Sequence, residues 1–443
     1  MGTSIDKPLV EFECSGTATL ENGRNFESNF LVAQLVDGSI AGSVELVNLP
    51  EGSSLIMMVS GELNKFGLEG VEKKNGFKLT VSNCYFARRT AGSTVLKGEF
   101  VASGVILKPD ILESKIEKPG IIVVSVTNMH KTFRVIVDGP LGKMQIAHDK
   151  NIDAMETLMN TQHISLVTSD IQIFIDKPYG KSVRELFEDV RDTVNGFLNI
   201  TRLAQTCWHD WCSIAVYEKD TIEQATLVAL KIRTPWRKAP STLGLTNPAH
   251  SDIFIRKGYE GYRKALEVEH GFESALHWYI ESNATEALES KYLLACTSME
   301  LLVDRLAKQL NGESVIPRDS FKKLSAVIRK AIHSWFSESG TVDGKQEQIQ
   351  LSVQALNRPS LRSKIESLLN KWNVKYNDLD LNLQDIINTR NQITHTGMSQ
   401  SKRLTEEYLK LYVVLTRVFL SMLRYDDDYY DWVHGAWRHQ DWL

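Results

Sequence analysis

The pattern of apolar and polar positions divides the chain into two halves. From about residue 8 to residue 175, apolar side chains alternate with polar ones with a period of two, and many of them are β-branched or aromatic. Turn residues such as Asn75-Gly76 separate these runs. The pattern predicts strands joined by turns. Because no long helices separate the strands, we predict an antiparallel sandwich or barrel-like domain.

One amphipathic helix and a pair of strands complete the first half. Apolar residues recur along one side of residues 182–204, which predicts a helix. Residues 213–217 and 225–232 have the composition of strands, and a loop with three prolines follows them. We therefore predict a β-rich sensor or regulatory domain over residues 1–235 and a linker over residues 236–251.

The second half has helical spacing almost throughout. We predict helices over residues 253–267, 272–282, 286–310, 318–335, 346–355, 361–372, 383–393 and 404–424. They form an all-α bundle over residues 252–425, followed by an aromatic and acidic tail over residues 426–443. The predicted fold class is therefore α+β with more than one domain.

Composition and charge narrow the classes of function. The net charge is −4, so the chain does not bind a polyanion through bulk positive charge, and any nucleic acid must meet a local site. The five cysteines are odd in number and scattered, which argues against a disulfide framework. The N-terminus has no signal peptide pattern, and the apolar stretch 409–423 is too short to span a bilayer and carries Arg417. We expect a cytoplasmic protein without a membrane partner.

An arginine and a histidine near the end of a predicted helix are the candidate chemical groups. Arg390 and His395 lie five positions apart, which places them about 140° apart around an ideal helix. The two side chains converge only if the helix loosens before His395. Gly397 and the β-branched Thr394 and Thr396 predict such a loosened last turn.

These two side chains suit the cleavage of RNA. An imidazole titrates near neutral pH, and a guanidinium offers phosphate oxygens a planar, permanently charged fork. The ribose 2′-hydroxyl would attack its own 3′ phosphate, with His395 as base or acid and Arg390 stabilising the charge of the transition state. This chemistry requires no metal or cofactor, and DNA is inert because it lacks the nucleophile.

The segment around these residues resembles the R-x(4-6)-H motif of HEPN proteins. Arg390 and His395 form its two ends, and Asn391 is the polar residue often found after the arginine. The amphipathic helix over residues 292–302 is similar to the earlier HEPN helix, and a buried helix over residues 412–423 follows the motif. A β-rich region before such a bundle is similar in layout to the ApeA-like antiphage proteins of bacteria, in which the HEPN domain is the RNase effector.

The resemblance implies both a set of site residues and a mode of assembly. Arg390, Asn391 and His395 would be catalytic, with Thr394 and Glu300 as candidates for a supporting role. HEPN domains pair so that two motifs face each other across a two-fold axis, which implies a homodimer. A toxic RNase needs restraint, so the first domain would hold the activity until a trigger arrives, such as a phage component.

Less specific interpretations compete with this one. Arg390 could be a surface ion-pair partner of Asp385, and His395 an ordinary helix-end residue favoured by the helix dipole. Glu300 lies mid-helix among leucines, where a polar stripe is the favoured interpretation. Two other classes of protein remain open: a non-catalytic HEPN module that binds RNA, nucleotide or protein, and a purely structural helical adaptor.

Three other segments carry residues that suggest chemistry. Cys207 to Cys212 (CWHDWC) contains zinc ligand types, but the spacing favours a buried turn. Gly180-Lys181-Ser182 lacks the leading glycine of a phosphate-binding loop, so nucleotide hydrolysis is not expected. The tail contains aromatics among aspartates that would repel RNA, which favours docking against its own bundle or a dimer partner.

Overall fold

The computed structural model divides the chain into two compact units, residues 1–259 and residues 260–443. The described residues are 8–50, 65–91, 94–116, 120–162, 164–175, 177–205, 207–218, 226–235, 245, 250–268, 271–309, 314–339, 343–399 and 401–438. A β-rich first part and a helical second part, as predicted, are confirmed. Of the predicted linker over residues 236–251, only Leu245, His250 and Ser251 lie within the described residues. The division between the units falls inside α4 (Ser251–Val268).

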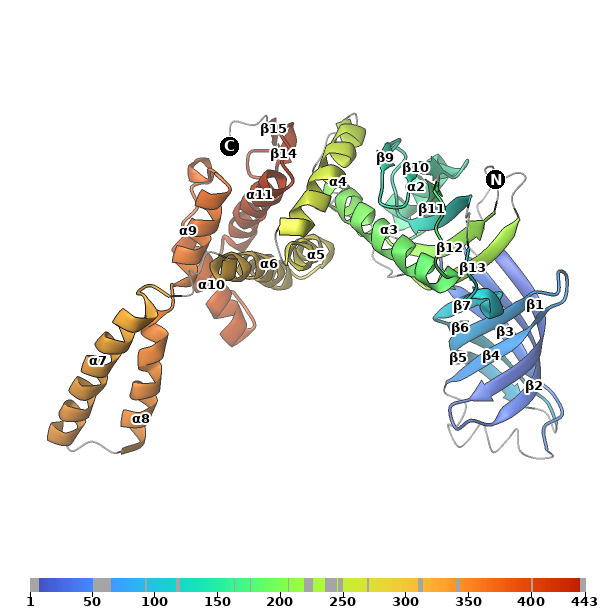
Figure 1. Ribbon diagram of the computed structural model, residues 1–443, viewed down its shortest axis with the longest axis horizontal. Coiled ribbons are helices and arrows are strands. Elements are labelled where there is room, and N and C mark those ends of the chain that lie inside the picture. The colour runs from blue at the N-terminus through green and yellow to red at the C-terminus, as the bar shows by residue number, and fades with distance from the viewer. Residues whose placement is uncertain are drawn as a thin grey trace. The chain divides into compact units, whose positions relative to one another are not determined.

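The first six strands form a closed antiparallel ring (Figure 1). They are β1 (Pro8–Leu20), β2 (Asn25–Leu35), β3 (Ile40–Leu46), β4 (Phe66–Glu72), β5 (Lys78–Ala91) and β6 (Leu96–Ala102). The order is β4-β1-β2-β3-β6-β5, and the long β5 closes it: residues 78–84 pair with β4 and residues 85–91 pair with β6. Alternating side chains fill the interior, as the period of two requires. Each strand contributes to this core, for example through Cys14, Phe30, Val44, Leu68, Val81 and Phe100.

The same sheet continues beyond the ring. It runs through β5 to β7 (Gly104–Leu107), β13 (Leu227–Arg233), β12 (Trp211–Tyr217), β8 (Ile121–Thr127), β11 (Val167–Phe174), β10 (Lys143–His148) and β9 (Ile136–Asp138). The predicted helix is α3 (Val183–Gln205), and Lys231 on β13 contacts both Phe187 and Glu188 on it. A short 3-10 helix (Pro109–Ile111) follows β7.

One helix among the strands was not predicted. Helix α2 (Ile152–Gln162) lies between β10 and β11. Its apolar residues recur at helical spacing, with Met155 and Met159 buried, but the helix has only 11 residues and lies between strands. Asp149 accepts a hydrogen bond from the Asn151 N–H just before the helix begins. This turn leads the chain directly into the helix, and so short an apolar run does not stand out among the strands on either side.

The helices of the second unit agree closely with the predicted ranges. They are α5 (Phe272–Ala284), α6 (Leu288–Gln309), α7 (Arg318–Ser339), α8 (Asp343–Ser352), α9 (Leu361–Lys371), α10 (Leu383–Thr396) and α11 (Leu404–Met422), with 3-10 turns η4 (Val353–Asn357) and η5 (Asn377–Leu379). Residues 411–422 of α11 are all buried, so this helix forms the centre of the unit. None of the described helices is both long and apolar enough to cross a membrane.

The C-terminal tail docks against the helices of its own unit. Its strands β14 (Tyr429–Asp431) and β15 (Ala436–Arg438) form a hairpin. The Arg417 guanidinium, buried on α11, donates to the Tyr429 hydroxyl and to the Asp431 carboxylate. Docking against the bundle, one of the two predicted arrangements, is thus observed for the described part of the tail. Residues 439–443 lie outside it.

Candidate active site

Helix α10 carries the Arg390 to His395 segment on a well-defined local structure. The Asn382 side chain caps its N-terminus by accepting from the Gln384 N–H. Leu383, Ile386, Thr389 and Ile393 form its buried stripe. Gly397 ends the helix with φ 75°, and its N–H donates to the Ile393 carbonyl at 2.8 Å. This is the left-handed cap that favours glycine.

The expectation that the helix loosens before His395 is wrong. Helix α10 continues through Thr396, because the buried Ile393 anchors its last turn. The Thr394 hydroxyl donates to the Arg390 carbonyl at 2.8 Å, so this β-branched residue is accommodated inside the helix. Arg390 and His395 therefore stay about 140° apart around the axis. Within one chain the structure does not bring them together.

Arg390 is held by a carboxylate from another helix. Its Nε lies 2.9 Å from Oε1 of Glu300 on α6, and its Nη2 donates to Oε2 at 3.1 Å. Both side chains are about one-third exposed. One hydrogen bond and one close ion-pair contact therefore hold the guanidinium against this carboxylate. The partner is thus Glu300, not Asp385 as in the competing interpretation, and Glu300 faces the candidate site instead of forming part of a plain polar stripe.

The remaining candidate residues lie on the exposed side of α10. The Arg390 Nη1 donates to Oδ1 of Asn391 at 3.1 Å. His395 is exposed, and in the part of the chain that the structure describes no hydrogen bond or ion pair engages its ring. A guanidinium has five N–H groups, so contacts with Glu300 and Asn391 leave about two for another acceptor. The segment can therefore offer a phosphate a positioned arginine and, on a different side of the helix, an accessible imidazole.

A buried cysteine lies one turn before Glu300 on α6. Burial raises the pKa of the Cys296 thiol, and the Glu300 carboxylate raises it further, whereas Arg390 opposes this shift. The thiolate is the reactive form of cysteine, so Cys296 is a packing residue rather than a nucleophile. The chemistry of this site therefore rests on the arginine and the histidine.

One group of potential metal ligands in the second unit already has a cationic partner. Asp378, Asp431 and His434 each place a ligand atom within 4.8 Å of the others. The Arg417 guanidinium binds Asp378 with two hydrogen bonds of 2.7 Å and Asp431 with one of 3.1 Å. A cation at this position would meet the arginine charge. The cluster is better explained as an internal ion pair that holds the tail.

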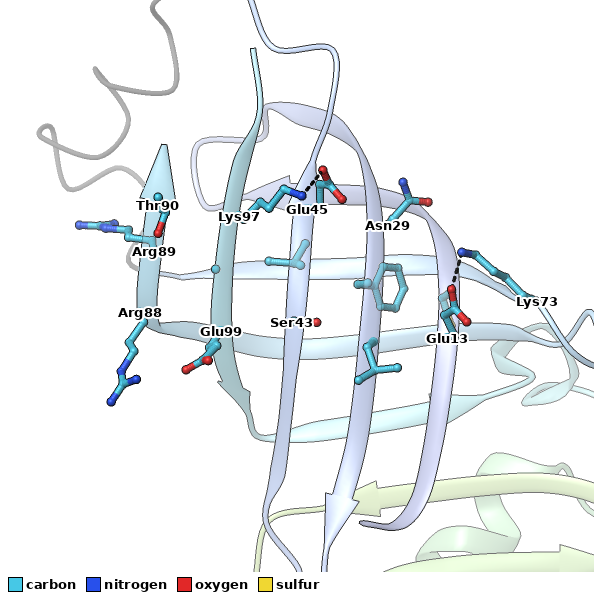
Figure 2. A pocket seen from close by; sticks show the side chains of 15 residues that line it. Glu13, Asn29, Ser43, Glu45, Lys73, Arg88, Arg89, Thr90, Lys97 and Glu99 are labelled. Atoms are coloured by element: carbon cyan, nitrogen blue, oxygen red, sulfur yellow. Dashed lines mark hydrogen bonds and ion pairs between the residues drawn. The ribbon is translucent and has the colours of Figure 1, made fainter. Parts of the chain in front are cut away.

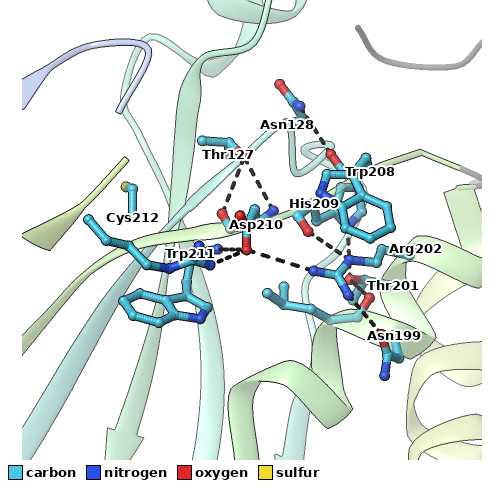
Figure 3. Close-up of polar contacts among 12 residues, drawn as sticks. Thr127, Asn128, Asn199, Thr201, Arg202, Trp208, His209, Asp210, Trp211 and Cys212 are labelled. Atoms are coloured by element: carbon cyan, nitrogen blue, oxygen red, sulfur yellow. Dashed lines mark hydrogen bonds and ion pairs between the residues drawn. The ribbon is translucent and has the colours of Figure 1, made fainter. Parts of the chain in front are cut away.

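The segment from Cys207 to Cys212 is the buried turn that its spacing favoured (Figure 3). The fully buried His209 ring bonds the Thr201 hydroxyl through Nδ1 at 2.8 Å, and Arg202 donates from Nε to the His209 carbonyl at 2.7 Å. The Asp210 carboxylate binds Arg233 and lies 3.9 Å from Arg202. All five cysteines of the chain are free and buried.

Burial of His209 predicts a specific loss of stability in acid. Desolvation lowers the pKa of His209 from 6.5 to about 3, and the nearby charges of Arg202 and His130 act in the same direction. The unfolded chain protonates His209 more readily than the folded chain does. The contribution of the neutral, buried ring to the free energy of unfolding is therefore complete above about pH 6.5, and it is lost as the pH falls toward 3. Between pH 7 and pH 5 the loss amounts to about 2 kcal/mol.

Urea unfolding at both pH values, followed by tryptophan fluorescence, tests this expectation. In the variant His209→Gln this position cannot take up a proton. Between pH 7 and pH 5 we therefore expect the decrease in its free energy of unfolding to be about 2 kcal/mol smaller than the decrease in the wild type. An equal fall in both proteins would mean that other groups cause the acid sensitivity.

Comparisons with known proteins address mainly the second unit. The family model described as the YopA C-terminal domain matches residues 266–441, a range that includes Glu300, Arg390 and His395. No curated protein and no solved structure matches the chain. The similarity therefore supports a shared domain over the helical unit.

Proposed function

We propose that this protein is a metal-independent endoribonuclease of the HEPN type. The observation that carries the proposal is the exposed end of α10, where Glu300 holds the Arg390 fork in place and His395 is accessible. The arginine can stabilise the extra negative charge of the phosphorane-like transition state. The histidine can transfer protons when the 2′-hydroxyl attacks the phosphate. Asn391 beside the fork, and Thr394 on the same helix, complete the set of site residues that we propose.

We place the working cleft between two copies of the chain. Arg390 and His395 diverge around one regular helix, so a single copy cannot aim both groups at one phosphate. Two copies of α10 facing each other would let the arginine of one meet the histidine of the other. A homodimer is therefore part of the proposal, and control of pairing would be a direct way to restrain the activity.

We further propose that the protein is a regulated toxic effector of antiphage defence, which acts in the cytoplasm by abortive infection. In this proposal the first unit is the sensor that controls the effector. The outer face of the ring carries a concave, charged surface (Figure 2). Lys73 pairs there with Glu13 at 2.6 Å, and Lys97 pairs with Glu45 at 2.9 Å. Arg88 and Glu99 lie on the neighbouring strands β5 and β6. A surface of mixed charge suits a protein ligand, such as a phage component, better than a polyanion.

Incubating the purified full-length chain with total RNA in EDTA tests the catalytic proposal. We expect new RNA ends that carry 2′,3′-cyclic phosphate, because attack by the 2′-hydroxyl leaves that group and needs no metal ion. The same assay in lysate of phage-infected cells supplies a candidate activator. Cleavage that appears only with added divalent metal, or that leaves 3′-hydroxyl ends, would contradict the mechanism.

One observation favours the alternative, a non-catalytic HEPN module that binds RNA, nucleotide or a protein. Glu300 occupies much of the Arg390 fork, and His395 points elsewhere on the helix. An arginine so placed could serve only as a phosphate anchor. That alternative predicts RNA binding that depends on Arg390, with no cleavage in EDTA, in metal or in infected lysate.

A further inference from the structure

A groove with a strong excess of positive charge lies in the second unit, apart from Arg390. It is lined by residues of α6, α7, η4 and α9, which we call the basic groove: Asp304, Lys308, Ser314, Arg318, Phe321, Lys322, Ser325, Arg329, Asn357, Arg358, Pro359 and Lys364. Six of these are Lys or Arg and one is acidic. The whole chain has a net charge of −4, so this concentration of cations is local.

The cations on α7 form a stripe along one face. Arg318, Lys322 and Arg329 follow one another with helical spacing, with Ser325 between the last two. The stripe extends over about 16 Å of the helix. Lys322 and Arg329 are exposed to solvent. A row of exposed cations of this length fits several consecutive phosphates of one strand.

The floor of the groove is a fixed structure. The buried Asn357 side chain accepts from the Ile316 N–H at 2.7 Å and donates to the Ile316 carbonyl at 2.9 Å. This clamp joins the segment before α7 to η4. Lys364 on α9 donates to Asp304 on α6 at 2.6 Å, so the one acidic side chain that lines the groove is already paired. Lys322 and Arg329 are exposed beside this pre-formed surface, where their charge can meet a ligand.

An aromatic ring among the cations narrows the class of ligand. Phe321 is half-buried and lies between Arg318 and Lys322 in sequence, and Pro359 lines the groove beside Arg358. Single-stranded nucleic acids are bound by cations that follow the backbone together with aromatic rings on which bases stack. An acidic peptide would use the cations but has no base to place on Phe321.

The groove adjoins the candidate active site along α6. Asp304 in the groove lies four residues after Glu300, which holds Arg390. Four residues of helix rise about 6 Å and return to the same side. We propose that the basic groove binds the sugar-phosphate backbone of single-stranded RNA and feeds it to the α10 site. The choice of RNA over other polynucleotides rests on the proposed function, whereas binding of the backbone does not.

Fluorescence anisotropy with a labelled single-stranded oligonucleotide tests the groove on the full-length chain. We expect the double variant Lys322→Ala, Arg329→Ala to bind roughly twentyfold more weakly at about 0.1 M salt. The logarithm of the binding constant should depend less steeply on the logarithm of the salt concentration. The magnitude of this slope should decrease by about 1.4, because each lost phosphate contact removes about 0.7. The matched control is Lys323→Ala, Lys330→Ala, which removes two exposed cations of α7 that do not line the groove.

Single-stranded DNA of the same sequence separates this inference from the proposed function. DNA has no 2′-hydroxyl to attack, so its binding is measured without any cleavage. Weaker binding of both DNA and RNA by the groove variant supports the groove, whether or not any RNA is cut. If the groove and control variants lose oligonucleotide affinity equally, or if neither loses any, the basic groove is not the binding site. Either result would overturn this inference even if RNA cleavage in EDTA is observed.

A second variant distinguishes a polynucleotide from an acidic protein segment. Phe321→Leu keeps an apolar side chain but removes the stacking ring. We expect it to weaken oligonucleotide binding at least fivefold without changing the salt slope. Unchanged binding by Phe321→Leu, together with equally tight binding of polyglutamate, would assign the groove to an acidic protein and overturn the RNA inference.

Discussion

Replacing His395 with alanine is expected to lower the rate of RNA cleavage by about 10²- to 10⁴-fold, the usual contribution of a general acid or base. RNA affinity should stay nearly unchanged, because the cations of Arg390 and the basic groove remain. The exposed ring makes no described hydrogen bond or ion pair, so its removal should alter stability by less than about 0.5 kcal/mol. Single-turnover cleavage and anisotropy measured on the same preparations separate the two effects.

Two comparisons make this expectation specific. His333→Ala removes another exposed histidine of the second unit and should cleave like the wild type. Mixing His395→Ala with Arg390→Ala should restore part of the activity, because a mixed pair holds one intact arginine and one intact histidine across the proposed interface. If His395→Ala cleaves RNA as fast as the wild type, His395 takes no part in the reaction. Failure of the mixture to recover would place both groups in one chain.

Replacing Arg417 with methionine is expected to destabilise the second unit by roughly 3–5 kcal/mol, because it removes the guanidinium that pairs with the buried Asp431 carboxylate. The Arg417 side chain is 1% exposed and that of Asp431 is 0% exposed. Arg417 also holds the pKa of Asp378 below its usual range through hydrogen bonds and charge. Without the guanidinium, Asp431 and the Tyr429 hydroxyl lose the group that joins the tail to α11.

Urea unfolding followed by the helical circular dichroism signal measures this effect, since the second unit is mainly helical. Arg362→Met is the matched control: its pair with Glu366 is solvent-exposed, so its loss should cost under about 0.5 kcal/mol. The loss of stability in Arg417→Lys should lie between those of Arg417→Met and Arg362→Met. An ammonium keeps the positive charge but cannot reproduce the planar set of hydrogen bonds of the guanidinium. Equal stability of Arg417→Met and Arg362→Met would show that the tail does not depend on this ion pair.

The sequence by itself determined the location and type of most elements. The helices of the second unit follow from apolar periodicity, a local property of the chain, and their predicted ranges differ from the observed ones mainly at the ends. The same reasoning placed Arg390, Asn391 and His395 on the C-terminal part of one helix, α10. It missed α2, which has only 11 residues and lies between the strands β10 and β11.

Only the tertiary structure decided what these residues meet. The pairing of Arg390 with Glu300 joins positions 90 apart in the chain, whereas the alternative partner considered from local spacing was Asp385. Burial of Ile393 kept α10 regular to Thr396, although the composition of the last turn had suggested a loosened end. The basic groove likewise combines α6, α7, η4 and α9. Periodicity shows which face of an element is buried, whereas the partners of that face depend on contacts between distant segments.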